Sequence, residues 1–590
     1  MKKFMALLLS AAMLLSGCGI LKSNKGSETA ATSGISTKYA SKLFDTSYVH
    51  KINIKINASD WSDLLKNPTK KTKYKADVTI DGETVDKVSF STKGNTSLSS
   101  IASSDSSDKY SFKINFGKYI DDQTYYGLNK LNLNNIYADA TYMKDYISYQ
   151  ISQKAGVDSP LTSFIQVTVN GKAQGLYLAL EDVSESFLAR TNGGNGELYK
   201  PETQQLNNVG NTNSKKNETK QSGMTPPDQN SSSNNQMSPP SGGFKDGDSV
   251  KSGNNGNGKM GFGSEDKGAS LKYTDDKIDS YSDIFNNAET DSSKKNEKTV
   301  IASLKGLSEY LGDTSSTDLD KYVDTSSVIK YFAAHNFVMN YDSYTGSMLH
   351  NYYLYEKNGK LSMVPWDYNL AFGAFQGGGG MGGGRPGDNK TQTGTTNNTA
   401  KQDQSGITNN TAKQDQSGTT NNTAKQDQSG ITNNRAKQTQ SGNSQGLNAT
   451  QIVNYGIDTP LSGAEGSDRP MWSWITSNDK YLQEYHETYN KLLKTYFESG
   501  DFEKEVDRVA KMIRPYVEKD TYAEYTVSQF DTAVKTLKSF CTKRAESIRK
   551  QLDGTISTDT SKQNESTRVD ASDINIQSMG SQGRDKKEQK

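Results

Sequence analysis

Cysteine is almost absent from this chain, which has only two, Cys18 and Cys541, among 590 residues. Cys18 ends an N-terminal apolar stretch with the features of a cleaved leader. Cys541 would then be the one thiol of the folded part, so a framework of internal disulfide bonds is excluded. The four histidines do not have the spacing of metal ligands. No G-x-S-x-G nucleophile elbow between a predicted strand and a predicted helix supports a Ser/His/Asp hydrolase.

An excess of charge of one sign is also missing. Lys and Arg number 69 and Asp and Glu number 68, which gives a formal net charge of +1. Proteins that bind the phosphate backbone of nucleic acids need a sustained basic face. The lysine runs at residues 70–75 and 543–550 alternate with polar residues and are interpreted as solvated surface. The sequence therefore argues against a nucleic-acid partner.

The N-terminus carries two lysines followed by an apolar run at residues 4–15. This run is too short to span a membrane as a helix and is typical of a signal peptide. It leads into Leu-Ser-Gly-Cys, which resembles a bacterial lipobox ending at Cys18. We therefore predict a lipoprotein signal peptide at residues 1–18, a lipid anchor on Cys18 in the cell membrane outside the cytoplasm, and a polar tether at residues 19–44. The alternative is an ordinary signal peptide with an incidental cysteine.

Two internal segments and the C-terminus are too polar to form a core. Residues 202–268 are rich in Asn, Ser, Gly, Lys and Gln, and residues 376–446 contain four copies of a 12-residue repeat typified by GTTNNTAKQDQS. Such segments cannot offset the chain entropy lost on folding, and the repeat is too short and polar for a solenoid. We predict two disordered insertions in a folded domain at residues 45–553, followed by a disordered tail at residues 554–590.

The rest of the sequence divides into a strand-rich part and a helix-rich part. Alternating apolar and polar residues predict several strands between about residues 49 and 181. A helical period predicts one main helix among them at residues 141–155, and helical patterns dominate after residue 294. The predicted fold class is α+β, with a mixed or antiparallel β lobe that carries one main helix and a mainly helical second lobe. This is the arrangement of a protein kinase.

The most informative stretch is residues 340–372, where three polar side chains surround a predicted hairpin. A tyrosine-rich β-type run, an Asn-Gly turn and a return strand follow one another. Asn351 precedes the first strand and Asp367 follows the second, so the two side chains can converge. Their oxygens suit Mg²⁺, which prefers one or two carboxylates together with substrate phosphates. Asp342, just upstream, stands where a phosphoryl-transfer enzyme keeps its base.

Several short motifs occur together with this stretch. They are KGNT at 93–96, YSFKI at 110–114, LNLNN at 131–135, NG at 170–171 and GLYLALE at 175–181, LYKP at 198–201, and NYDSYT, NYYLY and PWDYNLAFG between 340 and 373. In this order they strongly resemble the spore coat protein H (CotH) family of atypical protein kinases. The resemblance covers roughly residues 47–553 without the two insertions.

The resemblance implies a role for each polar residue around the hairpin. Asp342 would be the base that orients the acceptor hydroxyl, and Asn351 and Asp367 would be the Mg²⁺ ligands. Without the resemblance, Asp342 is a turn cap and Asp367 merely follows a Pro-Trp corner. Relatives often have an acid where this chain has Asn369, so the number of metal ions stays open. The His-Arg-Asp and Asp-Phe-Gly motifs of ordinary protein kinases are absent.

Lys113 lies in a predicted strand between apolar neighbours. A lysine on a sheet can simply face solvent, but the resemblance implies that Lys113 pairs with the phosphates of ATP. Its own ion-pair partner is expected on the helix at residues 141–155, where Asp145 is the only acid. Asp145 has an equally good alternative role as a helix N-terminal acid favoured by the macrodipole.

Further nucleotide contacts are assigned by position. Lys93 and Asn95 belong to a Lys-Gly-Asn-Thr loop, where glycine lets the backbone approach a phosphate. The loop lacks G-x-G-x-x-G, no Walker pattern occurs, and as a bare motif it is an ordinary turn. Glu181 ends a predicted strand where a kinase places its hinge to the adenine. His350, beside Asn351, either points at the site or has an ordinary turn role, and the turn role is favoured.

These assignments predict an atypical protein kinase that uses ATP and Mg²⁺ and phosphorylates Ser or Thr of an envelope or spore-coat protein. The alternative class is a non-catalytic surface adhesin or scaffold on a kinase-like fold, a role that the Asn/Gln/Gly-rich insertions would suit. A pure binding protein need not retain Lys113, Asp342, Asn351 and Asp367 together, which favours the enzyme. The protein substrate and the oligomeric state cannot be read from the sequence.

Overall fold

The computed structural model describes residues 36–104, 107–203, 266–315, 317–375 and 447–581. The predicted lipidation site Cys18, most of the tether, most of the first predicted insertion and all of the second therefore lie outside the described residues. All described residues except Leu447 belong to one compact unit. Within these residues, no helix is both long and apolar enough to cross a bilayer.

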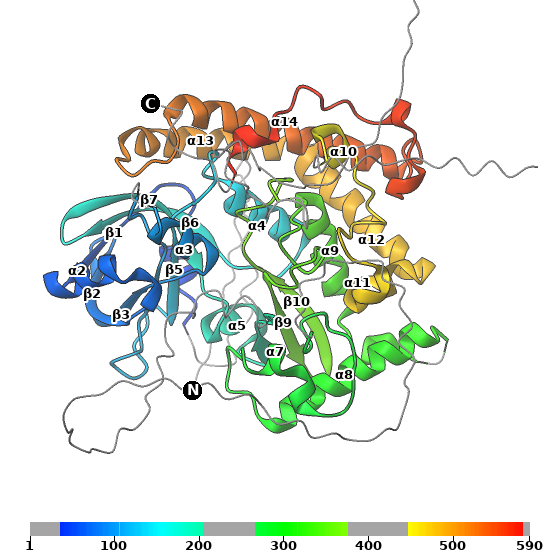
Figure 1. The fold of residues 1–590 in the computed structure, drawn as a ribbon, viewed down its shortest axis with the longest axis horizontal. Helices are drawn as coiled ribbons and strands as arrows, with labels where there is room; N and C mark the ends of the chain where they lie inside the picture. Colours follow the sequence, from blue (N-terminus) through cyan, green and yellow to red (C-terminus); the bar gives the residue numbers. More distant parts are fainter. Residues whose placement is uncertain (1–35, 105–106, 204–265, 316, 376–446, 582–590) are drawn as a thin grey trace, which may run out of the picture. The chain divides into compact units, whose positions relative to one another are not determined.

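Seven strands form a closed barrel in the order β1-β2-β3-β4-β5-β7-β6 (Figure 1). Neighbouring strands are antiparallel, except that β1 and β6 pair in parallel and close the barrel. The strands are β1 (His50–Ile56), β2 (Tyr74–Ile80), β3 (Glu83–Thr92), β4 (Phe112–Asn115), β5 (Lys130–Asn134), β6 (Thr162–Val169) and β7 (Lys172–Glu181). The predicted α+β class is confirmed, but the strand-rich part is a closed barrel rather than an open sheet.

The alternation of side chains along β4 determines which of them lie on the outer face of the barrel. Phe112 and Ile114 of β4 are fully buried in the barrel core, and successive residues of a strand point to opposite faces. Lys113, between them, therefore lies on the outer face, where its cross-strand neighbour is Asn132 of β5. The barrel thus positions Lys113 for contact with the rest of the molecule.

The start of the described chain corrects the predicted tether. Helix α1 (Tyr39–Lys42) places the fully buried Tyr39 in the barrel core, together with Leu43 and Phe44. The Tyr39 hydroxyl donates a hydrogen bond of 2.5 Å to the Glu181 carboxylate. The prediction of a tether as far as residue 44 is therefore wrong for residues 39–44, because three closely spaced apolar side chains are enough to anchor this segment.

The remaining elements are mostly helical. The helices are α2 (Ala58–Lys66), α3 (Thr96–Ala102), α4 (Lys144–Ala155), α5 (Glu185–Asn192), α7 (Ser282–Phe285), α8 (Lys294–Gly312), α9 (Thr325–Val338), α10 (Ala449–Val453), α11 (Pro470–Thr476), α12 (Asp479–Leu492), α13 (Asp501–Lys519) and α14 (Val527–Leu552). The main predicted helix is α4, which packs against both β6 and α9. It therefore connects the barrel with the helical part.

A second, three-stranded sheet has the order β10-β9-β8 and contains the predicted hairpin. Its strands are β8 (Glu197–Tyr199), β9 (Tyr352–Lys357) and β10 (Lys360–Pro365). Asn358 and Gly359 form the turn with φ angles of 55° and 80°, as a two-residue turn that matches strand twist requires. The prediction of a hairpin on an Asn-Gly turn is confirmed.

The C-terminal residues overturn the prediction of a disordered tail. Residues 555–581 are described, and they bury Ile556, Val569, Ala571, Ile574, Ile576 and Met579. The end of the first predicted insertion is also structured, because the Asp283 amide donates to the Lys267 carbonyl and Gly268 lies against Tyr281 and Ile284. The compositional prediction failed because a few apolar side chains among many polar ones suffice for packing.

Candidate active site

The open end of the β9–β10 hairpin brings Asn351 and Asp367 together. The last cross-strand pair is Tyr352 with Pro365, so Asn351 and Trp366 come next and Asp367 follows. Asn351 and Asp367 both have a left-handed backbone with φ 57°. Asn and Asp tolerate this conformation better than other non-glycine residues. Sparsely populated backbone conformations of this kind cluster at functional sites.

Asp342 lies beside Asn351, as predicted from the sequence. One Asp342 carboxylate oxygen is 2.7 Å from His350 Nε2, and the other accepts a 3.2 Å hydrogen bond from Asn351 Nδ2. The same Asn351 amide donates to the Asp342 backbone carbonyl at 2.7 Å. His350 is therefore a site residue, and its interpretation as a simple turn residue is wrong. All three side chains are half-buried and remain accessible to a ligand.

The backbone on both sides of the Asp367 side chain is fixed by neighbours. Asn340 Nδ2 donates to the Asp367 carbonyl at 3.0 Å, and the Asp367 amide donates to the Tyr149 hydroxyl at 3.2 Å. The next amide, that of Tyr368, donates to an Asp145 carboxylate oxygen at 2.7 Å. Helix α4 thus contributes two acceptors, Asp145 and Tyr149, that hold Asp367 in its left-handed conformation.

Asp145 and Lys93 are linked through Asn134 at the end of β5. Lys93 Nζ donates to Asn134 Oδ1 at 2.8 Å, and Asn134 Nδ2 donates to Asp145 at 3.3 Å. Lys93 Nζ also lies 5.3 Å from the centre of the Trp366 ring. Burial lowers the pKa of Lys93 to about 8, against the opposing effect of the Asp367 carboxylate. The Lys-Gly-Asn-Thr loop therefore brings Lys93 to the site.

The carboxylates of the site repel one another. Burial and, next, the charge of Asp367 raise the pKa of Asp145 to about 7. Burial also raises the pKa of Asp367, an effect that Lys93 opposes and Asp342 reinforces. Such shifts are typical of functional sites. A cation or a proton bound here would relieve the repulsion.

Lys113 has a different partner from the one predicted. Its Nζ lies 2.8 Å from the buried Asp182 carboxylate, which also accepts a 2.8 Å hydrogen bond from Asn132. Burial acts to raise the pKa of Asp182, but the Lys113 ammonium outweighs it and holds the pKa below its usual value. The prediction that Asp145 pairs with Lys113 is wrong, because β7 pairs with β5 and so places Asp182 beside β4.

Two other predicted nucleotide contacts have local partners. The buried Glu181 carboxylate binds Arg190 at 2.6 Å, the Tyr39 hydroxyl and the Leu161 amide at 3.0 Å. Both carboxylate oxygens are occupied by these hydrogen bonds and this ion pair, so the Glu181 side chain does not belong to the site. Asn95 is exposed, and its Oδ1 accepts a 2.6 Å hydrogen bond from Lys71 Nζ.

Two oxygen acceptors remain available at the hairpin end. Among the described residues, neither the Asp367 carboxylate nor Asn351 Oδ1 has a hydrogen-bond donor. One carboxylate and one amide oxygen fit Mg²⁺, which keeps waters and phosphate oxygens as its other ligands. They do not form a complete protein cage, and the described part of the chain contains no group of three His, Cys, Asp or Glu side chains that could hold a metal.

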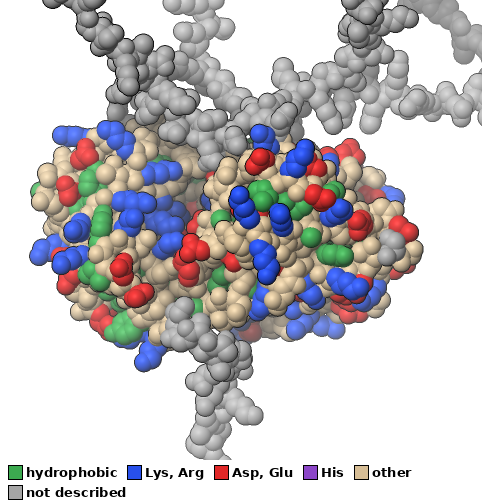
Figure 2. All heavy atoms as spheres, turned by 90° about the horizontal axis from the view of Figure 1, so that it is seen from below, with side chains coloured by type: hydrophobic (Ala, Val, Ile, Leu, Met, Phe, Trp, Pro, Cys, Tyr) green, Lys and Arg blue, Asp and Glu red, His purple; other side chains and the backbone are tan. Residues whose placement is uncertain are grey.

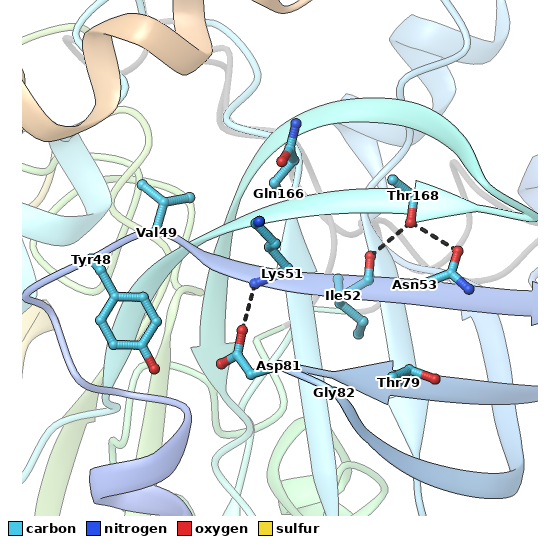
Figure 3. A pocket seen from close by; sticks show the side chains of 10 residues that line it. All are labelled: Tyr48, Val49, Lys51, Ile52, Asn53, Thr79, Asp81, Gly82, Gln166 and Thr168. Atoms are coloured by element: carbon cyan, nitrogen blue, oxygen red, sulfur yellow. Dashed lines mark hydrogen bonds between the residues drawn. The ribbon is translucent and has the colours of Figure 1, made fainter.

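The face of the molecule seen from below the view of Figure 1 carries side chains of both charges. Figure 2 shows Lys and Arg side chains gathered beside a hollow, with Asp and Glu side chains across from them. A shallow groove of about 610 Å³ lies elsewhere, on the outside of the barrel near Tyr48 and Asp81 (Figure 3). Its Asn53 and Thr168 side chains bond to each other at 2.8 Å, and none of the candidate site residues lines it.

Comparison with known proteins decides the family. The sequence matches the family described as CotH kinase protein over residues 90–548. This chain belongs to the CotH kinase family. It is also similar to the inner spore coat protein H of Bacillus subtilis (strain 168), with 33% identity over 91 residues that cover 15% of this chain and 24% of that protein. The chain thus matches about a quarter of the length of that relative.

The motif-based resemblance is therefore confirmed, and membership of the CotH kinase family indicates a kinase-like enzyme. The family match begins in β3 and ends in α14, so it includes every candidate site residue from Lys93 to Asp367. It does not reach residues 549–581.

Sequence reasoning on this CotH kinase family protein missed several site residues. Asn132 and Asn134 lie in the LNLNN motif, and Asn340 lies in NYDSYT. These motifs were recognised, but no role was predicted for the three asparagines. Asp182, the ion-pair partner of Lys113, directly follows Glu181 and received no predicted role, because Asp145 was expected to pair with Lys113. The sequence around Tyr149 indicates only a helix. The contact of Tyr149 with Asp367 could not be predicted, because it depends on how α4 packs against the hairpin.

The fully buried His335 contacts Ser343, the residue after Asp342, and predicts a pH dependence of the protein's stability that can be tested. Its Nδ1 is 3.1 Å from the Tyr368 hydroxyl, and its Nε2 is 2.9 Å from Ser343 Oγ. Burial lowers the pKa of His335 to about 3. Because this is below the unfolded value, the contribution of His335 to stability is complete above about pH 6.5 and is lost as the pH falls.

We expect the free energy of unfolding to fall by about 2–3 kcal/mol more in the wild type than in His335→Gln between pH 7 and pH 4.5. Urea unfolding of both proteins at the two pH values measures this difference. The other three histidines are present in both proteins and cancel. Equal pH dependence of the two proteins would show that folding does not lower the pKa of His335.

Proposed function

We propose that this protein is an atypical protein kinase that transfers the γ-phosphate of ATP to Ser or Thr of an envelope or spore-coat protein. The observation that carries the proposal is the joint placement of Asp342, Asn351 and Asp367 at one hairpin end, with free oxygens on the last two. The barrel, with Lys93 and Lys113, and the helical part would act as two lobes around the nucleotide.

Each side chain would have a defined task in this reaction. Asn351 Oδ1 and the Asp367 carboxylate would hold Mg²⁺ together with the phosphates, and the chemistry that the ion supplies is neutralisation of phosphate charge. Lys113, oriented by Asp182, would bind phosphate oxygens. Asp342 would accept the proton of the acceptor hydroxyl. The oxygen of that hydroxyl would bond to the γ-phosphorus as the bond from the γ-phosphorus to the β–γ bridging oxygen breaks and ADP leaves. His350 would keep the Asp342 carboxylate in place.

Lys113 offers a direct test of nucleotide binding. We expect Lys113→Met to weaken the affinity for ATP·Mg²⁺ by about 10- to 100-fold, because a charge-assisted contact contributes about 1.5–3 kcal/mol. Calorimetry below the melting temperature measures this. Lys55→Met, which changes an exposed lysine on β1, is the control and should leave the affinity unchanged. Equal affinity of all three proteins would remove Lys113 from the site.

We also propose that the protein is anchored by a lipid on Cys18 at the outer side of the cell membrane or in the spore envelope. The lipobox and the name of the relative, an inner spore coat protein, support this. Cys18→Ser should move the protein from the membrane fraction to the soluble fraction. Retention of the variant on membranes after a high-salt wash would contradict a purely lipid anchor.

A further inference from the structure

The C-terminal segment beyond α14 packs against the residues that lead into α4. Its last turn, η8 (Ile576–Met579), lies against α14, and Met579 is fully buried. The Met579 carbonyl accepts a 3.1 Å hydrogen bond from the Ala140 amide. Met579 lies outside the part of the chain that matches the CotH kinase family, whereas Ala140 lies within it.

The start of α4 is built on a buried acid and a buried lysine. The Asp139 carboxylate accepts hydrogen bonds of 2.8 Å from the amides of both Thr141 and Lys144. Lys144 is fully buried, and its Nζ lies 3.3 Å from the carbonyl of Gly580 and 3.4 Å from that of Ala138. A buried ammonium is costly unless it is paired and hydrogen-bonded. The Gly580 carbonyl is therefore one of the groups that make this helix start stable.

The helix start connects directly to the candidate site. Asp145 follows Lys144, and its carboxylate holds the Tyr368 amide. One turn later, the Tyr149 hydroxyl holds the Asp367 amide. A shift of the α4 start would therefore be transmitted to the backbone of Asp367, which depends on these acceptors for its left-handed conformation.

We propose that the segment at residues 574–580 is a positioning element for Asp367, acting through the start of α4. The proposal rests on the proposed kinase function for its effect on rate, but its structural part does not. The segment touches none of the candidate site residues in the hydrogen bonds described, so its action is indirect. Residues outside the family match would thus complete the site of this chain.

Gly580 allows a small and specific perturbation of this contact. Its φ is 95°, and a Cβ atom there would lie 2.5 Å from the Ala138 carbonyl oxygen and 2.7 Å from the Ala140 nitrogen. Gly554→Ala provides a control for alanine at a positive φ, because the φ of Gly554 is 82° and a Cβ atom there would meet nothing within 4 Å. Both substitutions place alanine at a positive φ. Gly580 also has ψ 150°, in a region nearly restricted to glycine, and only Gly580→Ala should displace the segment from the helix start.

The first arm of the test is hydrogen exchange, which needs no activity. In Gly580→Ala we expect faster exchange in peptides covering both residues 139–150 and residues 366–372, compared with Gly554→Ala. Lys144→Met, which removes the bond to the Gly580 carbonyl without the new Cβ, is a second variant in case the first does not fold. If exchange at residues 366–372 stays unchanged in the folded variants, the segment does not position Asp367 and the proposal is wrong.

The second arm is kinetic. In Gly580→Ala we expect kcat to fall by about 10- to 100-fold, as for loss of an outer support of a metal ligand, with little change in KM for ATP. A change in the melting temperature without this split between kcat and KM would reduce the segment to a stabilising role and overturn the proposal. Absence of transfer in the wild type would count against the kinase function alone, and the exchange arm would still decide whether the segment positions Asp367.

Discussion

Asp367→Asn is expected to lower phosphoryl transfer by at least about 100- to 1,000-fold while the protein stays folded. The substitution removes the charge that would hold Mg²⁺ but keeps the shape of the side chain. Asparagine also tolerates the left-handed backbone at this position, as it does at residue 351. Alanine at this position would add backbone strain, so the effect of losing the charge could not be separated from the effect of the strain.

The same variant should be at least as stable as the wild type. Among the described residues the Asp367 carboxylate has no hydrogen-bond donor, and it raises the pKa of Asp145 by repulsion. The pKa of Asp367 is raised although the Lys93 charge opposes the rise, so the ionised carboxylate is unfavourable in the folded state. Removing its charge should therefore leave the melting temperature unchanged or higher. Asp122→Asn, an exposed residue with φ 60°, is the matched control. Full activity of Asp367→Asn would exclude Asp367 as a metal ligand.

Asp342→Asn is expected to retain ATP·Mg²⁺ binding and to lose turnover by about 100-fold or more, the usual contribution of a general base. The amide can still receive a hydrogen bond from His350 or Asn351 on its oxygen, but it cannot accept the proton of the acceptor hydroxyl. Nucleotide affinity and transfer should be measured on the same preparation. The expected separation of the two distinguishes a catalytic role from a role in nucleotide binding.

The control for Asp342 is His350→Gln, which loses the 2.7 Å contact to the Asp342 carboxylate but keeps the carboxylate itself. Its turnover should fall less than that of Asp342→Asn. Turnover of Asp342→Asn equal to that of the wild type would remove Asp342 from the mechanism.

The parts of the site that depend on local sequence could be predicted. The Asn-Gly turn and the tyrosine-rich run before it fix the β9–β10 hairpin within a few residues. Asn351 and Asp367 flank that hairpin, so their convergence follows from the register alone. Asp342 lies close enough in sequence to reach Asn351 without knowledge of the rest of the fold.

The parts that depend on long-range packing could not be predicted. The pairing of Lys113 with Asp182 requires β4, β5 and β7 to be neighbours, and strand order is not a local property. Tyr39 and Met579 belong to segments whose composition is mostly polar, so periodicity gave no sign that they are buried. Their burial is decided by distant partners, Glu181 for Tyr39 and the start of α4 for the C-terminal segment.

The central claim is that the hairpin end of this CotH kinase family protein is a phosphoryl-transfer site. The most direct measurement is incubation of the wild-type protein with γ-labelled ATP, with and without Mg²⁺, together with nucleotide binding on the same sample. We expect nucleotide binding and Mg²⁺-dependent transfer of the label to Ser or Thr side chains. Absence of both nucleotide binding and transfer would contradict the claim and favour a binding module that keeps the fold without the chemistry.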